Sequence, residues 1–141
     1  MKTYEQFSKK SRVSYSCVLL NPESHQLLKN TYCNELSEDW KIYCHHMTIC
    51  MGELPPDLKS RIGEEIEIET VKIGQDDKAF VVKVNPLDDE LQTYYTPPKF
   101  PHVTLAVNTI NNGKPFMSNK IGNWDAIENM KLYGRITEIK N

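Results

Sequence analysis

Six segments of the chain have the composition of β-strands, and only one segment has the pattern of a full helix. The strands are predicted at Arg12–Leu20, Trp40–Met51, Glu65–Ile73, Lys78–Val84, His102–Val107 and Lys131–Ile139. The helix is predicted from Asn21-Pro22, an N-cap followed by proline at the first helical position, to about Tyr32. Six strands with one helix indicate an α+β domain with antiparallel sheets.

The middle of the chain predicts a hairpin that is followed by a long loop. Apolar residues alternate along Glu65–Ile73, and Gly74–Asp77 then forms the turn to the next strand. Pro86–Pro101 holds four prolines and two tyrosines and is predicted to be a loop, and long loops in compact domains often carry function. Short helical turns are predicted at two further places, Pro55–Gly63 and Trp124–Asn129.

The composition excludes some classes of protein. The 141 residues fit a single domain, 1–141, and 17 basic against 19 acidic residues give a net charge of −2. That balance argues against a binder of long nucleic acid but is compatible with a small phosphorylated ligand.

The sequence has no apolar run of membrane-spanning length, and Met1–Arg12 is polar and unlike a signal peptide. We therefore expect no membrane partner and a cytoplasmic location. The oligomeric state is left open.

The cysteines and histidines do not have the spacing of a metal site. Cys17, Cys33, Cys44 and Cys50 form no CxxC pair, and no HExxH motif or glycine-rich phosphate loop is present. Cys44 and Cys50 are predicted to lie in one extended strand, where they cannot bridge each other. The cysteines are therefore expected as reduced thiols, and neither a metal nor another cofactor is predicted.

Two short strings share the form His-x-Thr-apolar. They are His46-Met47-Thr48-Ile49 and His102-Val103-Thr104-Leu105, 56 residues apart and both inside predicted strands. Because alternate residues of a strand share a face, each histidine and its threonine are expected on one face. The buried face would hold Met47, Ile49 and Met51 in the first strand and Val103, Leu105 and Val107 in the second. His45 would fall on the buried face and have a structural role, which leaves His46 as the candidate.

Two imidazoles and two hydroxyls that converge on one cleft suit phosphodiester chemistry. Histidine can act as base or acid near neutral pH, so one ring can deprotonate the attacking oxygen while the other protonates the leaving oxygen. Threonine hydroxyls can donate hydrogen bonds to the non-bridging phosphate oxygens. Such a reaction needs no metal.

The paired motifs resemble the signature of the 2H phosphoesterases, a superfamily of metal-independent enzymes that act on phosphodiesters and cyclic phosphates. The resemblance implies a compact bilobal α+β fold, with antiparallel sheets around a central cleft and one motif from each lobe. It makes His46 and His102 the acid–base pair and Thr48 and Thr104 the phosphate binders. The strings WKIYCHHMTICMGELP and FPHVTLAV are similar to phage anti-CBASS nucleases, which implies a cyclic di- or trinucleotide substrate of bacterial defence and the host cytoplasm as location.

Aromatic side chains are the candidates for holding the bases of such a ligand. Tyr15, on the first strand, and Trp124, after the Asn- and Gly-rich loop, are predicted to bind substrate. Tyr94 and Tyr95 are alternative stacking residues, and Lys99 and Arg135 are alternative phosphate partners.

Two other functions remain open at this point. The first is an RNA-end enzyme that opens 2′,3′-cyclic phosphates or ligates 2′-5′ junctions. The second is a non-catalytic module that binds a nucleotide or RNA and does not use the His-x-Thr strands for chemistry. Which histidine is the acid and which the base is not decided by the sequence.

Overall fold

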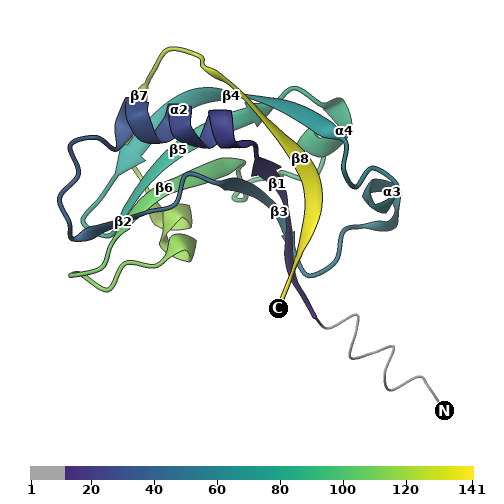
Figure 1. Ribbon diagram of the computed structural model, residues 1–141, viewed down its shortest axis with the longest axis horizontal. Coiled ribbons are helices and arrows are strands. Elements are labelled where there is room, and N and C mark those ends of the chain that lie inside the picture. The colour runs from purple at the N-terminus through teal and green to yellow at the C-terminus, as the bar shows by residue number, and fades with distance from the viewer. Residues whose placement is uncertain (1–11) are drawn as a thin grey trace.

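A computed structural model describes residues 12–141 (Figure 1). Of the segment Met1–Arg12, which the sequence predicts to be unlike a signal peptide, only Arg12 is among the described residues. The strands are β1 (Val13–Leu20), β2 (Trp40–Ile42), β3 (His46–Met51), β4 (Glu65–Gln75), β5 (Ala79–Pro86), β6 (His102–Asn108), β7 (Trp124–Ala126) and β8 (Lys131–Lys140). The helices are α2 (Pro22–Tyr32), α3 (Pro56–Lys59), α4 (Asp89–Gln92) and the 3-10 helix η1 (Pro115–Lys120).

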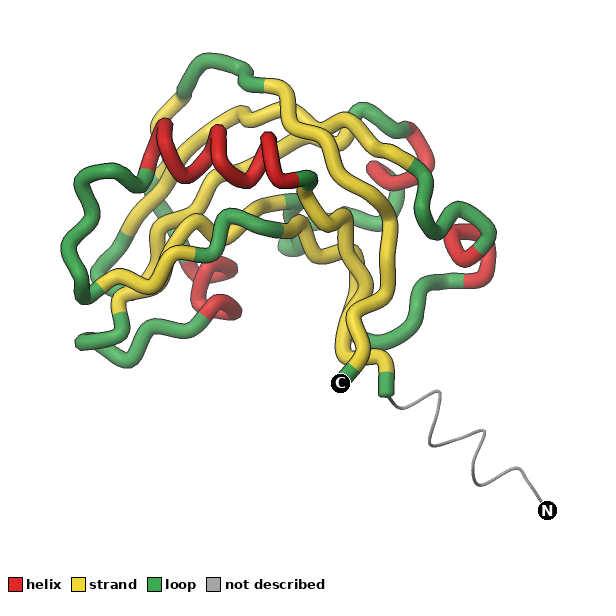
Figure 2. The backbone as a smooth tube through the Cα atoms, in the orientation of Figure 1, coloured by secondary structure: helices red, strands yellow, loops and turns green. Residues whose placement is uncertain are grey.

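Six strands form a closed antiparallel β-barrel in the order β6-β3-β1-β8-β4-β5, with β5 pairing again with β6. The short strands β2 and β7 extend the sheet beside β6 and β4. Figure 2 shows the strands surrounding the core, with α2 as the longest helix and the other helices short. The expected bilobal α+β fold is therefore wrong. The alternation of apolar and polar residues predicts which face of a strand is buried, but it does not predict which strands pair along their edges. In a closed barrel the first and last strands of the sheet also pair with each other, whereas a two-lobed fold would leave these edges unpaired.

The interior of the barrel is filled by apolar side chains from all six strands. They include Val18, Met47, Ile49, Ile66, Ile68, Val82, Val84, Val103, Leu105, Leu132 and Ile136. The expected alternation is confirmed for Met47, Ile49, Val103 and Leu105, which are all fully buried. Met51, however, is 79% exposed, because it ends β3 where the chain leaves the barrel.

The predicted helix is confirmed as α2. The Asn21 side chain accepts a hydrogen bond from the Ser24 amide at 2.8 Å, and Pro22 is in the first turn. Leu28 is fully buried and packs against the barrel core. Among residues 12–141, no helix combines the length and the apolar character needed to cross a membrane.

The strand predicted at Trp40–Met51 is two strands with a break at Cys44. Cys44 has a φ of 56°, which is in the left-handed region and interrupts the extended chain. Its amide still donates to Thr104 O at 3.0 Å. The register against β6 changes across the break, from Ile42 opposite Ala106 to Met47 opposite Val103. Cys44 is thus not in the same strand as Cys50.

The helical turn predicted at Trp124–Asn129 is also wrong, because this segment begins with strand β7. Trp124 pairs with Gly74 of β4. A Cβ atom at Gly74 would lie 2.6 Å from Ile121 Cγ2 and 2.9 Å from Trp124 Cε3. Glycine therefore allows the close approach that the pairing requires, a contact between distant segments that local sequence does not reveal.

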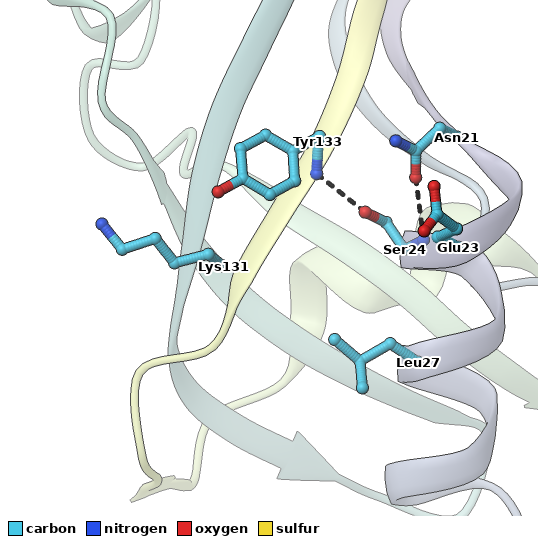
Figure 3. Close-up of a pocket in the computed structure, with 6 residues that line it drawn as sticks. All are labelled: Asn21, Glu23, Ser24, Leu27, Lys131 and Tyr133. Atoms are coloured by element: carbon cyan, nitrogen blue, oxygen red, sulfur yellow. Dashed lines mark hydrogen bonds between the residues drawn. The ribbon is translucent and has the colours of Figure 1, made fainter.

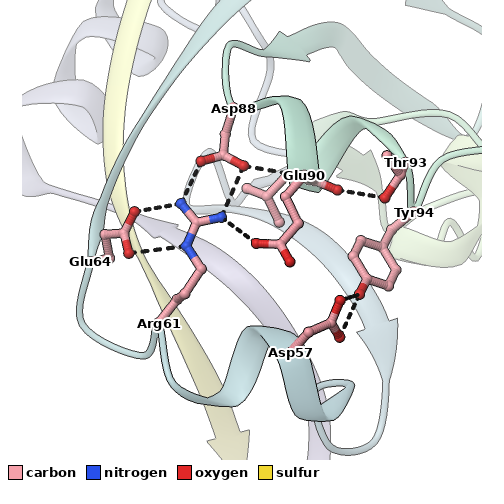
Figure 4. A network of polar contacts seen from close by, with 8 residues as sticks. Asp57, Arg61, Glu64, Asp88, Glu90, Thr93 and Tyr94 are labelled. Carbon is pink, nitrogen blue, oxygen red and sulfur yellow. Dashed lines mark hydrogen bonds and ion pairs between the residues drawn. The ribbon is translucent and has the colours of Figure 1, made fainter.

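An ionic network holds the start of the 86–101 segment, which contains α4 as well as loop (Figure 4). The Arg61 guanidinium binds the carboxylates of Glu64, Asp88 and Glu90. Arg61 lowers the pKa of Asp88, and Asp88 also caps α4 by accepting from the Leu91 amide at 3.0 Å. This end of the segment is therefore anchored to the turn before β4.

Candidate active site

The two His-x-Thr motifs lie side by side on β3 and β6. Met47 and Val103 pair across these antiparallel strands. Continuing this register by one residue in each direction places His46 opposite Thr104 and Thr48 opposite His102. All four side chains are partly exposed, whereas Met47 and Val103 are buried. The four residues thus form a square on the outer face of the barrel, in which histidines and threonines alternate at the corners. We call these four residues the His–Thr patch.

The two histidines occupy diagonal corners of the patch. Diagonal neighbours on paired strands are about 7–8 Å apart at the backbone, so both imidazoles leave the sheet from neighbouring positions on one face. Burial, followed by repulsion from His45 and His102, lowers the pKa of His46 to about 4. Burial also lowers the pKa of His102, although the Phe100 carbonyl acts in the opposite direction. Both rings are therefore neutral at pH 7 in the free protein.

A backbone contact fixes the tautomer of His102. Its Nδ1 lies 3.0 Å from the carbonyl oxygen of Phe100. A carbonyl oxygen can only accept, so Nδ1 carries the hydrogen and the lone pair of the neutral ring is on Nε2. The Nε2 atom of His102 is consequently a proton acceptor.

The ring of His46 contacts two other rings. Tyr15, from β1, has its ring centroid 5.0 Å from that of His46, and the His45 ring stacks on it at 4.7 Å. The Nδ1 atoms of His45 and His46 are 2.7 Å apart, so one donates and the other accepts. The assignment of His45 to the buried face is therefore wrong: His45 follows the Cys44 break, precedes β3 and contacts His46.

Thr104 has a partner that sequence reasoning missed. Its Oγ1 lies 2.7 Å from Ser118 Oγ, and Ser118 is fully buried in η1. This bond restricts the rotation of the Thr104 hydroxyl. Nothing in the sequence distinguishes Ser118 from other polar residues, since it lies in a segment predicted to be a loop.

Trp124 lies beside the patch, on strand β7 and not in the predicted helical turn. Its ring meets the Phe100 ring edge to face, with centroids 5.6 Å apart, and Phe100 lies 5.0 Å from His102. The Lys83 ammonium lies over both rings, 4.6 Å from Trp124 and 5.0 Å from Phe100. Lys83 was also missed, because an outward-facing lysine on an amphipathic strand looks like any surface lysine.

The alternative candidates are divided between two places. Tyr95 and Lys99 contact strand β3 of the patch. Tyr95 Oη donates to Thr48 O at 2.5 Å, and Lys99 Nζ donates to Ile49 O. Tyr94 instead donates to Asp57 within the network of Figure 4. Arg135 donates to Gly63 O on the β8 side of the barrel. Only the first pair is thus close to the motifs.

A pocket of about 310 Å³ lies between α2 and β8 and is separate from the patch (Figure 3). It is lined by Asn21, Glu23, Ser24, Leu27, Lys131 and Tyr133. Its central polar groups stabilise the fold, because Asn21 caps α2 and Ser24 Oγ accepts from the Tyr133 amide at 2.8 Å. We assign this pocket no chemistry.

The four cysteines are free thiols. Cys33 Sγ and Cys44 Sγ are 3.7 Å apart, and both residues are buried. Across residues 12–141, no three or more His, Cys, Asp or Glu side chains are grouped so that they could hold a metal ion.

Known protein families and curated proteins give no relative of this chain.

Proposed function

We propose that the protein is a metal-independent phosphodiesterase that uses His46 and His102 as its acid–base pair. The observation that carries the proposal is the alternation of two imidazoles and two hydroxyls on adjacent strands. Phosphodiester cleavage needs a proton acceptor, a proton donor and donors for the non-bridging oxygens, and these four side chains supply all three.

In the proposed reaction His102 is the base, because its Nε2 carries the free lone pair. Water or a ribose 2′-hydroxyl loses its proton to this nitrogen as the new O–P bond forms. His46 donates a proton to the leaving oxygen as the old P–O bond breaks. Thr48 and Thr104 donate to the non-bridging oxygens. His46 must first gain a proton, which an adjacent phosphate anion favours by raising its pKa.

For the substrate, we propose a cyclic di- or trinucleotide messenger. The support is the resemblance of the motifs and their flanking strings to 2H phosphoesterases of the anti-CBASS type, together with a net charge of −2, which suits a small ligand better than long nucleic acid. Tyr15, beside His46, is positioned to stack on a base. RNA-end cleavage and binding without turnover are the alternative outcomes of the test.

The test is a product analysis by mass spectrometry. The protein is incubated in excess EDTA with cyclic dinucleotides, cyclic trinucleotides and RNA that ends in a 2′,3′-cyclic phosphate. We expect cyclic oligonucleotides to be cleaved, and His46→Ala and His102→Ala each to abolish cleavage. His25→Gln, at a histidine outside the patch, is the matched control and should retain it. Turnover only with added metal, or unchanged rates in either patch variant, would refute the proposal.

A further inference from the structure

The Lys83 ammonium is held by aromatic rings and not by a carboxylate. Its Nζ lies 4.6 Å from the Trp124 centroid and 5.0 Å from the Phe100 centroid. Lys59 and Lys131, by contrast, pair with glutamates. In the part of the chain that the structure describes, Lys83 forms no ion pair. A cation–π contact orients an ammonium without cancelling its charge, so Lys83 presents a net positive charge.

A second lysine faces this charge. Lys72 of β4 is the cross-strand partner of Lys83 of β5. Two like charges directly opposite each other on a sheet repel. Lys72 is exposed, and Lys83 is partly buried. Two positive charges on neighbouring strands make this side of the barrel a favourable place for an anion.

Lys83 also belongs to the same row of side chains as the patch. It pairs with His102 across β5 and β6, and the β3–β6 register places Thr48 on the far side of His102. Cross-strand partners have Cβ atoms about 4.5–5.5 Å apart and share a face. Phe100 contacts both members of the pair, with its ring 5.0 Å from that of His102. Lys83 and the proposed base therefore leave the sheet on the same face, and both contact the Phe100 ring.

The patch itself lacks a positive charge at neutral pH. Both histidines are neutral in the free protein because burial lowers their pKa values. The nearby Lys99 is already engaged, since its ammonium donates to the Ile49 carbonyl and lies over the Tyr95 ring. A phosphodiester that binds here needs a cation to offset its charge.

We propose that Lys83 is the residue that binds the anionic phosphodiester oxygen on the His102 side of the patch, and that Phe100 and Trp124 hold it in position. This inference rests on the proposed function. It also changes the role of Trp124 from a base-stacking residue to a support for the phosphate-binding lysine.

The test compares two probes that differ in one non-bridging group on the phosphorus, an anionic oxygen in the first and a methyl group in the second. One is a thymidine dinucleotide with a 3′,5′-phosphodiester, and the other is the same dinucleotide with a neutral methylphosphonate. Affinities are measured by calorimetry in a His46→Ala background, which prevents turnover of the diester. We expect Lys83→Met to weaken binding of the diester roughly tenfold, as for a lost charge-assisted hydrogen bond, and to leave the methylphosphonate affinity unchanged. Lys83→Arg should retain most of the diester affinity.

Lys131→Met is the matched control, because it removes the same charge from the β8 side of the barrel. An equal loss for both probes would show that Lys83 only supports the structure and would overturn the inference. A parent protein that does not prefer the diester over the methylphosphonate would overturn it as well. Turnover in the EDTA experiment reports separately on the proposed function. Turnover by a parent protein that shows no preference for the diester refutes only the role of Lys83, and a preference for the diester without turnover refutes only the catalysis.

Discussion

Ser118 Oγ lies 2.7 Å from Thr104 Oγ1 and joins η1 to the strand that carries the second motif. The two residues differ in exposure, because Ser118 is fully buried while Thr104 is partly open to solvent. A buried hydroxyl with one fixed partner holds that partner in a single rotamer. Ser118 thus acts on the patch through Thr104 and does not need to contact a ligand.

Replacing Ser118 with alanine should slow catalysis more than it weakens binding. The Thr104 hydroxyl would lose its fixed orientation, so we expect kcat to fall about threefold to tenfold, equivalent to at most ~1.4 kcal/mol of barrier, with little change in KM. The lost hydrogen bond should cost about 1 kcal/mol of stability. Steady-state kinetics on the cleaved substrate and urea unfolding measure the two effects. Ser60→Ala, at the end of α3, is the control, and an unchanged kcat in Ser118→Ala would contradict the role.

Much of the fold follows from local sequence, but the barrel does not. Asn21-Pro22 predicts α2 because a cap acts within one turn, and the alternation of Glu65–Ile73 predicts β4 because the face of a strand is a local property. Closure depends on which strand edges meet. The Met47–Val103 pairing joins residues 56 positions apart, and no local pattern distinguishes it from two motifs on separate sheets.

The candidate site divides in the same way. The motif residues His46 and His102 could be selected from their spacing and alternation. Lys83, Ser118 and His45 could not, because their positions depend on the β5–β6 register, the fold of η1 and the backbone break at Cys44. Residues that contact a site only through tertiary structure carry no distinguishing signal in one sequence.

The depressed pKa of His46 makes stability depend on pH. Its pKa is about 4 in the folded protein and near 6.5 when unfolded. The unfolded chain therefore binds the proton first, so this contribution is fully present above pH 6.5 and is lost as the pH falls toward 4. After discounting for partial exposure, we expect a loss of about 1 kcal/mol between pH 7 and pH 5.

Urea unfolding of the wild-type protein and of His46→Gln at these two pH values measures that contribution. Carboxylates with lowered pKa values, such as Asp88, titrate below this window and do not interfere. The variant should lose part of the pH dependence. If the free energy of unfolding changes equally with pH in the two proteins, the pKa of His46 is not lowered by folding.

Removing Arg61 should destabilise the turn before β4 and the segment it anchors. Arg61→Met leaves three carboxylates close together without their shared cation. Because the network is partly exposed, we expect a cost of about 1–2 kcal/mol, smaller at high salt. Thermal unfolding at low and high salt provides the measurement. Lys131→Met, which breaks a single exposed pair with Glu67, should cost much less, and an equal cost would show that the network adds nothing.

Gly74 should be required for the position of Trp124, and through it for that of Lys83. A Cβ at Gly74 would lie 2.6 Å from Ile121 Cγ2 and 2.9 Å from Trp124 Cε3, so Gly74→Ala must displace β7. Overpacking of this kind costs about 1–3 kcal/mol. We expect the Trp124 fluorescence to shift toward that of a solvated indole when it is measured in a Trp40→Phe background.

Gly122 provides a matched control for this substitution, because a Cβ there would meet no atom within 4 Å. Gly122→Ala should leave the fluorescence and the affinity for the charged dinucleotide unchanged. Gly74→Ala should lower that affinity in parallel with the spectral shift, since the indole that holds the Lys83 ammonium has moved. A spectral shift without loss of affinity would separate Trp124 from the lysine and show that Phe100 alone is enough to hold it.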